Sequence, residues 1–374
     1  MNFLFMSSFL EVLSVIGYVL LAVLVLLLMI TVHEFGHYIA GKILKFKIDE
    51  FAIGFGPKIF KKVKKNGEIF SVRAFPIGGF CAFHGEGEDV KDDGLAFNNK
   101  APWKRIIVLV SGALMNYLFA LVLICSMFGI YGRTALVTVD MTPTTEFSEE
   151  YCFSPYDVII KANGKNAYLT TDLMNAISNK QKGDLVDFSI RRGGKDLDVK
   201  IAMRCDTDFK NLEDNEKLFT ALGVSYEAGE KGEITKSGLY NTSVRFGFFS
   251  TIGQSFDYSF KLAGTVFSVL GQLLTGRIGI GSMGGTVTTI SVTVQAIKVG
   301  GFRYLLNIAG FIGVNLAVFN LLPIPALDGS HVVFTLIEWI LKRPVNRKVE
   351  AIIHTVGLAL LLCFAVILDL QRCF

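Results

Sequence analysis

The chain has 374 residues, of which 51% are hydrophobic and only 19% are charged, which is unusual for a soluble globular protein of this length. Its net charge of +4 sets 37 basic against 33 acidic side chains, a balance that excludes a strongly basic nucleic-acid-binding protein. The composition therefore predicts a protein of the lipid bilayer, without nucleic acid as a partner.

Four long runs without a charged side chain predict about four transmembrane helices. The first run, Val12 to Val32, would span about 31 Å as a helix, which is the thickness of the hydrocarbon core. It is too long for a signal-peptide core, and no basic residue precedes it. The other runs are Ile106 to Gly132, Tyr304 to Leu327 and Ala351 to Leu368, the last interrupted only by His354.

Basic residues indicate which connections face the cytoplasm. Residues 41–105 contain 13 Lys and Arg, and the connection before the fourth run adds Lys342, Arg343, Arg347 and Lys348. Because short cytoplasmic loops are enriched in positive charge, we expect a multi-pass protein with both termini extracytoplasmic. The long connection between the second and third runs would then lie outside.

The polar half of that connection predicts a small α+β module. Asp157 to Gly164 reads as a strand entering a turn, Thr170 to Asn179 as a helix, and Asp187 to Arg192 with Asp196 to Ala202 as a hairpin around two glycines. The order of these elements resembles a bacterial PDZ domain, whose groove accepts an extended peptide by strand addition. The alternative role for the module is a purely steric one, in which it obstructs access without binding a peptide.

The apolar half of the connection, from Tyr240 to Gly301, predicts an amphipathic helix lying in the membrane interface. A fifth transmembrane span is the competing interpretation. Two cysteines of the connection, Cys152 and Cys205, could form a disulfide, although spacing alone does not establish one.

A metal-binding pattern, His33-Glu34-Phe35-Gly36-His37, follows directly on the first apolar run. Positions four apart share a helix face, so His33 and His37 can bind one Zn²⁺ while Glu34 takes a proton from water. Zinc suits amide hydrolysis because it lowers the pKa of a water molecule toward about 7. Ionisable side chains beside hydrocarbon are costly, which favours a functional role for the motif over helix-end residues that reach the headgroups.

A catalytic zinc site needs a third protein ligand, for which Asp328 is the candidate. It follows the third apolar run, where Pro323 and Pro325 must break the helix and can redirect the chain toward the first span. An N-cap role for Asp328 is the alternative, and His331 is the rival ligand.

Together these motifs resemble the site-2 protease family of zinc intramembrane proteases, closest to the bacterial regulator of sigma-E protease group. The likeness covers nearly the whole chain, with the HExxH motif, then the module, then Asn320-x-x-Pro323-x-Pro325-x-Leu-Asp328-Gly329. It implies that Asp328 and both histidines bind zinc and that Glu34 is the general base. The expected substrate-binding residues are Asn320, Pro323, Pro325, Gly78 and Gly79.

Two further segments match the family. Residues 70–86, with Gly78 and Gly79, alternate toward a hairpin that resembles the family's re-entrant β-loop, which would pair with an unwound substrate; an ordinary cytoplasmic hairpin is the alternative. Gly112 and Asn116 match the family's Gly-x-x-x-Asn pattern in the second span and are expected to support the site structurally.

The resemblance thus implies an intramembrane endopeptidase of the bacterial inner membrane, with its active site near the cytoplasmic leaflet. By the resemblance, it cuts single-pass membrane proteins, such as an anti-sigma factor or a remnant signal peptide, that another protease has already shortened outside. A soluble-domain zincin is disfavoured because its motif would need a polar domain around it, and an inactive scaffold with a partner-binding module is the alternative function. The expected regions are 1–132 with HExxH and the β-loop, 133–238 as the module, 239–302 as the interfacial segment and 303–374 with Asp328.

Overall fold

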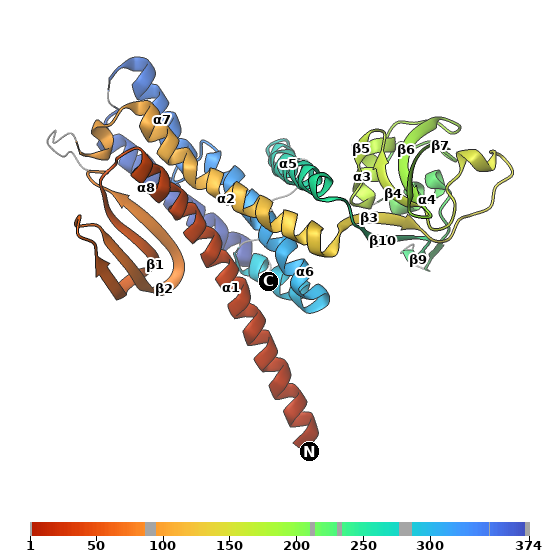
Figure 1. Cartoon of the computed structure of the whole chain (residues 1–374), viewed down its shortest axis with the longest axis horizontal. Coiled ribbons are helices and arrows are strands. Elements are labelled where there is room, and N and C mark those ends of the chain that lie inside the picture. Colours follow the sequence, from red (N-terminus) through yellow and green to blue (C-terminus); the bar gives the residue numbers. More distant parts are fainter. Residues whose placement is uncertain are drawn as a thin grey trace. The chain divides into compact units, whose positions relative to one another are not determined.

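The computed structural model describes residues 2–86, 95–209, 214–229, 234–276, 286–343 and 345–370. The chain forms two compact units. One, the membrane unit, comprises Met1–Met127 with Ile252–Phe374, and the other, the inserted module, comprises Phe128–Thr251. The module thus interrupts the membrane unit in the chain (Figure 1).

Long helices dominate the membrane unit. Four segments are long and apolar enough to cross a bilayer, which confirms the prediction of about four spans. They are Leu13–Ile43, Pro102–Tyr131, Gly300–Leu321 and Arg347–Leu370. The helices are α1 (Asn2–Ile43), α2 (Pro102–Tyr131), α5 (Phe248–Leu274), α6 (Thr286–Leu321), α7 (Asp328–Leu341) and α8 (Arg347–Leu370).

The third span ends earlier than its apolar run. α6 stops at Leu321, whereas the uncharged sequence continues to Leu327, because Pro323 and Pro325 cannot continue a helix. α6 also contains a kink at Gly301, whose φ of 58° and ψ of −142° only glycine adopts readily, so the span begins there as a new helix.

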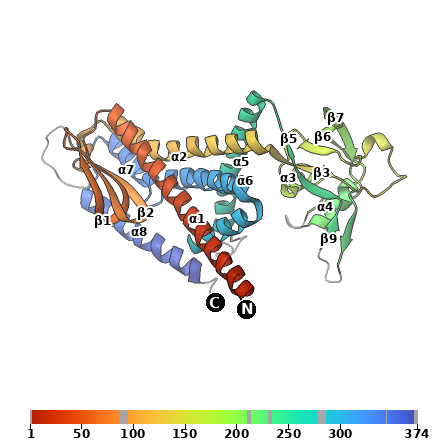
Figure 2. The same cartoon turned by 60° about the horizontal axis from the view of Figure 1, so that its bottom comes forward.

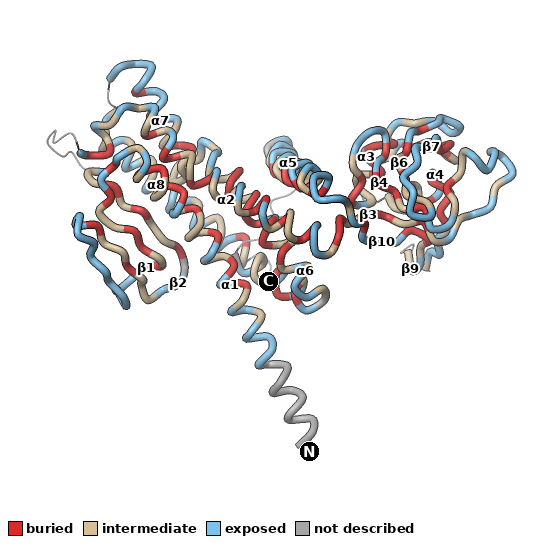
Figure 3. The backbone as a smooth tube through the Cα atoms, in the orientation of Figure 1, coloured by how far each residue is buried: buried red, intermediate tan, exposed pale blue. Residues whose placement is uncertain are grey.

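The apolar segment after the module forms α5, which is not among the candidate spans of the described chain. Large aromatic side chains of α5 are exposed, including Phe249 at 86% and Phe260 at 65%. The exposed apolar surface of the four spans is also large, since only 11% to 44% of the most apolar 18-residue stretch of each span is buried (Figure 3). A bilayer would cover such surface, so the chain is a membrane protein.

Two bent strands, β1 (Ile48–Val63) and β2 (Ile69–Phe83), form a sheet beside the end of α1 (Figure 2). Each strand bends and so has two arms, 48–53 and 58–63 in β1 and 69–73 and 79–83 in β2. The first arm of β1 pairs with both arms of β2, since Ile53 lies opposite Gly79 on one side and Val72 on the other. The order across the sheet is therefore 58–63, 69–73, 48–53 and 79–83.

The expectation of a hairpin within residues 70–86 is therefore wrong. The two arms of β2 do not pair with each other, because the first arm of β1 lies between them. Glycines make the bends: Gly54 and Gly56 in β1 have φ of 84° and 88°, and Gly78 in β2 has φ of 100°.

The inserted module is an antiparallel sheet with two short helices. The predicted strand, helix and hairpin are confirmed as β4 (Val158–Ala162), α3 (Thr170–Ile177), and β6 (Leu185–Arg192) with β7 (Lys195–Ala202). The sheet order is β10-β3-β4-β6-β7 with β5 beside β4. The remaining elements are β3 (Arg133–Thr138), β5 (Lys165–Asn166), α4 (Asn215–Leu222), β8 (Tyr226–Ala228), β9 (Ile234–Ser237) and β10 (Leu239–Val244).

The module has its own apolar core, in which Leu173 of α3 and Phe188 of β6 are almost fully buried. Its first and last strands in the chain, β3 and β10, pair along their whole length from Thr138 with Leu239 to Arg133 with Val244. Cys152 and Cys205 are both free thiols, so the structure does not contain the disulfide that their location allowed.

Candidate active site

The two histidines of the HExxH motif lie side by side on α1. The helix continues without a break to Ile43, because the sequence contains no Pro and only one Gly in the turn between them. His33 and His37 are 8% and 7% exposed, and their Nε2 atoms are 3.1 Å apart. The four-residue spacing thus places both imidazoles on one buried face.

Asp328 reaches these histidines from the other end of the sequence. Its Oδ2 atom lies 2.9 Å from Nε2 of His33 and 3.3 Å from Nε2 of His37. Asp328 is the first residue of α7, and no side chain caps that helix, so the capping alternative has no support in the structure. The rival ligand, His331, lies apart from this group and is 3.4 Å from Glu350.

The chemistry of this group fits a zinc ion. Nδ1 of His37 lies 2.8 Å from the carbonyl oxygen of Val108 and can only donate to it, so Nε2 presents a lone pair. Oδ2 of Asp328 is buried and receives no hydrogen bond within the described chain. Lone pairs that converge without a proton between them repel, and a cation relieves that repulsion. Two imidazoles and one carboxylate leave a fourth position open for water, as catalytic zinc requires.

His33 needs a partner of its own if Nε2 binds metal, because Nδ1 must then carry the proton. The amide nitrogens of Asn116 and Asn320 lie 3.5 Å and 3.4 Å from that Nδ1. Oδ1 of Asn116 is buried without a hydrogen bond, and turning the amide by 180° would bring this oxygen to the Nδ1 proton. The two asparagines therefore lie where they can fix the tautomer of His33.

Glu34 lies next to the group at the wall of a cavity of about 300 Å³. Gly79 of β2 is close by, since a β-carbon there would lie 3.5 Å from Cγ of Glu34. The residues lining the cavity are Ile30, His33, Glu34, Asn116, Leu316, Asn320, Ala326, Leu327 and Asp328.

Small residues bring the supporting elements into contact. A β-carbon at Gly112 would lie 2.4 Å from Nε2 of His37, so α2 has no room for a side chain beside the imidazoles. On the facing helix, a β-carbon at Gly36 would lie 2.4 Å from the carbonyl oxygen of Ser111. Pro323 and Pro325 lie in the loop between α6 and α7 and are not part of the cavity wall, and Gly78 forms the bend of β2.

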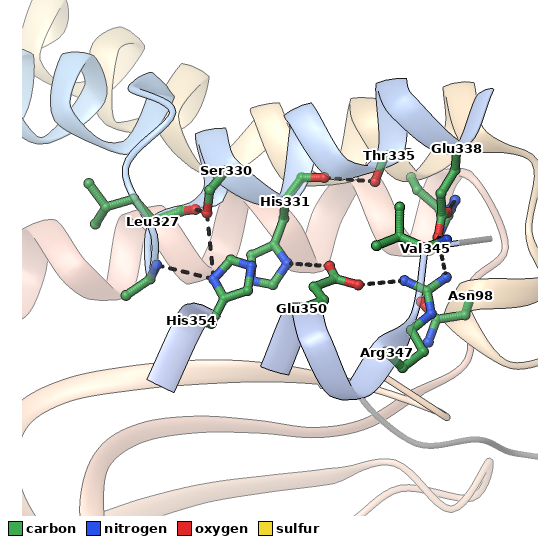
Figure 4. A network of polar contacts seen from close by, with 12 residues as sticks. Asn98, Leu327, Ser330, His331, Thr335, Glu338, Val345, Arg347, Glu350 and His354 are labelled. Carbon is green, nitrogen blue, oxygen red and sulfur yellow. Dashed lines mark hydrogen bonds and ion pairs between the residues drawn. The ribbon is translucent and has the colours of Figure 1, made fainter. Parts of the chain in front are cut away.

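A second polar cluster of His331, Glu350 and His354 connects α7 to α8 (Figure 4). Its ligand atoms lie within 4.8 Å of one another, yet Nδ1 of His354 accepts a hydrogen bond from Ala326, and Arg347 lies 2.8 Å from Glu350. A guanidinium so close disfavours a second cation. The sequence offered one signal for this cluster, since His354 alone interrupts the fourth apolar run.

The chain is similar over nearly its whole length to known proteins. The sequence pattern of peptidase family M50 matches residues 21–364. A relative from Clostridium perfringens is 32% identical over 95% of this chain and 98% of its own length. Relatives from Clostridium acetobutylicum and Fusobacterium nucleatum are 30% and 28% identical, each over 94% of this chain and over 96% and 97% of their own lengths. All three bear the name "Putative zinc metalloprotease".

Proposed function

The chain belongs to peptidase family M50, the site-2 protease family of zinc metalloproteases, and from that premise we propose that it cleaves membrane proteins within their transmembrane helices. One observation carries the proposal. His33 and His37 lie within the candidate span Leu13–Ile43, and their group with Asp328, with Glu34 beside it, lines a cavity of about 300 Å³.

Each residue of the site has a distinct part in this reaction. His33, His37 and Asp328 would hold the zinc ion, which would supply a hydroxide near neutral pH and act as a Lewis acid on the scissile carbonyl. Glu34 accepts the proton of the attacking water and passes it to the nitrogen of the leaving amine. Asn320, which also lines the cavity, can hydrogen-bond the substrate backbone.

A transmembrane helix must unwind before a protease can reach its amides, and the β-sheet offers a partner for the unwound chain. Residues 79–83 form an edge of the sheet, and within the described chain no strand other than β1 pairs with them. This edge is the one that contains Gly79, next to Glu34. A substrate strand added there would have its backbone groups paired and its scissile bond near the catalytic group.

The natural substrates that this arrangement suits are single-pass proteins that another protease has already shortened. Anti-sigma factors and remnant signal peptides are of this kind, and cutting them would place the enzyme second in regulated intramembrane proteolysis. The protein would lie in the bacterial inner membrane with both termini extracytoplasmic and its active site near the cytoplasmic leaflet. The inserted module would then be external and PDZ-like, and its bulk would select short substrates.

The test is cleavage of a synthetic transmembrane substrate by the purified chain and its Glu34→Gln variant. The glutamine is nearly isosteric but cannot accept the proton of water, so the variant should keep about one zinc per chain and lose cleavage by at least about 10²-fold. Glu149→Gln, at an exposed position of the module, is the matched control and should cleave normally. Cleavage by Glu34→Gln would contradict the mechanism. A wild-type chain that neither binds zinc nor cleaves would favour the inactive scaffold.

A further inference from the structure

The loop that leads into Asp328 contains a backbone conformation that its residue type disfavours. Ala326 has a φ of 77°, in the left-handed region that residues with a β-carbon rarely adopt. This residue lies two positions before the proposed ligand, so its backbone angles direct where the Asp328 carboxylate points. Contacts around the loop must offset the unfavourable energy of that conformation.

One such contact comes from a distant helix, α8. The backbone N–H of Ala326 donates a hydrogen bond to Nδ1 of His354 at 3.1 Å, whereas the neighbouring amides of Ile324 and Leu327 bond to carbonyl groups of the loop itself. The hydroxyl of Ser330, in the first turn of α7, lies 3.5 Å from the same Nδ1. Because a backbone amide can only donate, Nδ1 of His354 is an acceptor and the ring proton is on Nε2.

A second contact fixes the distance between α8 and the loop. Gly357 lies on the same face of α8 as His354, one turn later, and a β-carbon there would lie 2.3 Å from Cβ of Pro325. No side chain fits at that position without moving the loop. The helix thus meets the loop twice, through an acceptor at Ala326 and through close backbone packing at Pro325.

The His354 ring is itself held in place (Figure 4). His331 stacks on it with the ring centroids 3.7 Å apart and an angle of 6° between the planes. Nδ1 of His331 lies 3.4 Å from Glu350, whose carboxylate also pairs with Arg347 at 2.8 Å. The acceptor therefore has a defined orientation toward the loop, as a support for a metal ligand requires.

We propose that α8 acts as a clamp on this loop and that His354 is a positioning residue for the third zinc ligand. The hydrogen bond to Ala326 stabilises the left-handed conformation that presents the Asp328 carboxylate to His33 and His37. This inference rests on the proposed metal site, but it does not depend on which substrate is cleaved.

Two variants of His354 separate the acceptor from the shape of the ring. His354→Phe keeps an aromatic ring to stack on His331 but removes the acceptor, whereas Asn can place its side-chain oxygen near the position of Nδ1. Zinc affinity is measured on the purified full-length protein by competition with a chromophoric chelator. We expect His354→Phe to bind zinc about 10- to 100-fold more weakly, the usual effect of losing an outer support, and His354→Asn to stay near the wild type.

A substitution in the loop before Asp328 should restore zinc binding to the His354→Phe variant. Glycine adopts a φ of 77° freely, so Ala326→Gly should recover much of the zinc affinity that His354→Phe loses. Thr355→Ala, on an exposed position of the same helix, is the control and should leave zinc affinity unchanged. Rescue by the loop substitution distinguishes a clamp on the loop from general damage to α8.

Several results would overturn the proposal. Wild-type affinity in His354→Phe would show that the hydrogen bond does not position the ligand, and equal losses in the Phe and Asn variants would exclude the acceptor role. Two zinc ions per wild-type chain, of which the His354 variants lose one, would instead identify the His331, Glu350 and His354 cluster as a second metal site. If Asp328→Ala binds zinc as tightly as the wild type, the proposed metal site fails, and the clamp has nothing to position.

Discussion

Gly112 of α2 lies so close to His37 of α1 that a β-carbon on it would meet the imidazole Nε2 atom at 2.4 Å. The same β-carbon would lie 2.8 Å from Cε1 of His33, so one small residue leaves room for both histidines. Overpacking a closely packed site forces side chains out of their preferred rotamers, and here those side chains are the proposed metal ligands.

Gly112→Ala should therefore lower zinc affinity about 10- to 100-fold and reduce cleavage, although alanine is the better helix former. Gly129→Ala in the same helix is the matched control, because a β-carbon at Gly129 would meet nothing within 4 Å. Chelator competition and thermal unfolding of both variants would check this. Wild-type zinc binding by Gly112→Ala would show that the helices separate easily.

Removal of a proposed zinc ligand should weaken zinc binding more than removal of a residue that only positions a ligand. We expect His33→Ala and Asp328→Ala to lose stoichiometric zinc, since two remaining ligands do not make a stable site. His331→Ala tests the rival ligand and should keep one zinc per chain. The measurement is the metal content of each purified variant after dialysis, and a zinc-free His331→Ala would reverse the assignment of the third ligand.

Much of this architecture follows from local sequence patterns. Uncharged runs predicted the four spans, and the spacing of His33 and His37 predicted a shared helix face, because both features depend on residues that are neighbours in the sequence. Pro323 and Pro325 predicted the break before Asp328 for the same reason. The continuation of α1 to Ile43 was not predicted, because the uncharged run ends where the polar HExxH motif begins.

What the sequence did not predict depends on pairing between distant residues. The lysine-rich segment 58–65 was used only for its positive charge, yet much of it is the outer arm of β1, whose pairing depends on glycine bends at 54 and 56. Likewise, His354 and Ala326 are 28 residues apart, and nothing in either local sequence indicates a left-handed alanine held by an imidazole.

The sheet beside the active site should weaken in acid. Glu68, between β1 and β2, is 2% exposed, and its carboxylate pairs with Lys42 of α1 and, at 2.7 Å, with Lys64. Burial would raise the pKa of Glu68, but hydrogen bonds from Lys42, Lys64 and Asn66 outweigh burial and lower this pKa to about 2. The folded pKa lies below the ordinary value of about 4.5, so the stabilisation is complete above that pH and is lost as pH falls toward 2.

Hydrogen exchange of residues 48–83 at pH 7 and pH 3 would measure this effect. We expect the wild type to lose protection at the lower pH, and Glu68→Gln to be less protected at pH 7 and to change less between the two. Glu50, whose carboxylate accepts hydrogen bonds from Ser71, Lys58 and Arg73, also has a pKa of about 2 and should account for part of the remaining dependence. Equal acid sensitivity in Glu68→Gln and the wild type would contradict the argument.

The orientation in the membrane can be tested at two exposed turns. Lys65 lies in the turn between β1 and β2, and Lys195 begins β7 directly after the tight turn at Gly193 and Gly194. A reporter fused after Lys65 should be active in the cytoplasm, and one inserted near Lys195 should be active outside, because the basic connections are expected to stay inside. The opposite pattern would overturn the proposed topology.

The last prediction concerns how the enzyme would spare intact membrane proteins. If the bulk of the inserted module excludes substrates with large external domains, removing the module should widen the range of substrates. Excision of residues 140–206 alone would leave α4 without the core against which it packs. Thr138 and Leu239 are directly paired, so an Asn-Gly turn in place of residues 139–238 would close β3 and β10 into a hairpin.

This shortened enzyme should cleave a full-length substrate that the intact enzyme spares, and it should cleave a pre-trimmed substrate at a similar rate. A series of substrates with external domains of increasing size gives a second measure on the intact enzyme, whose rate should fall as the domain grows. The rate of the shortened enzyme should not depend on that size. Removing a mere obstruction would not stop cleavage of a substrate that was already small enough to pass it. If the shortened enzyme is folded and binds zinc but no longer cuts the pre-trimmed substrate, the module is therefore a receptor that recruits substrate.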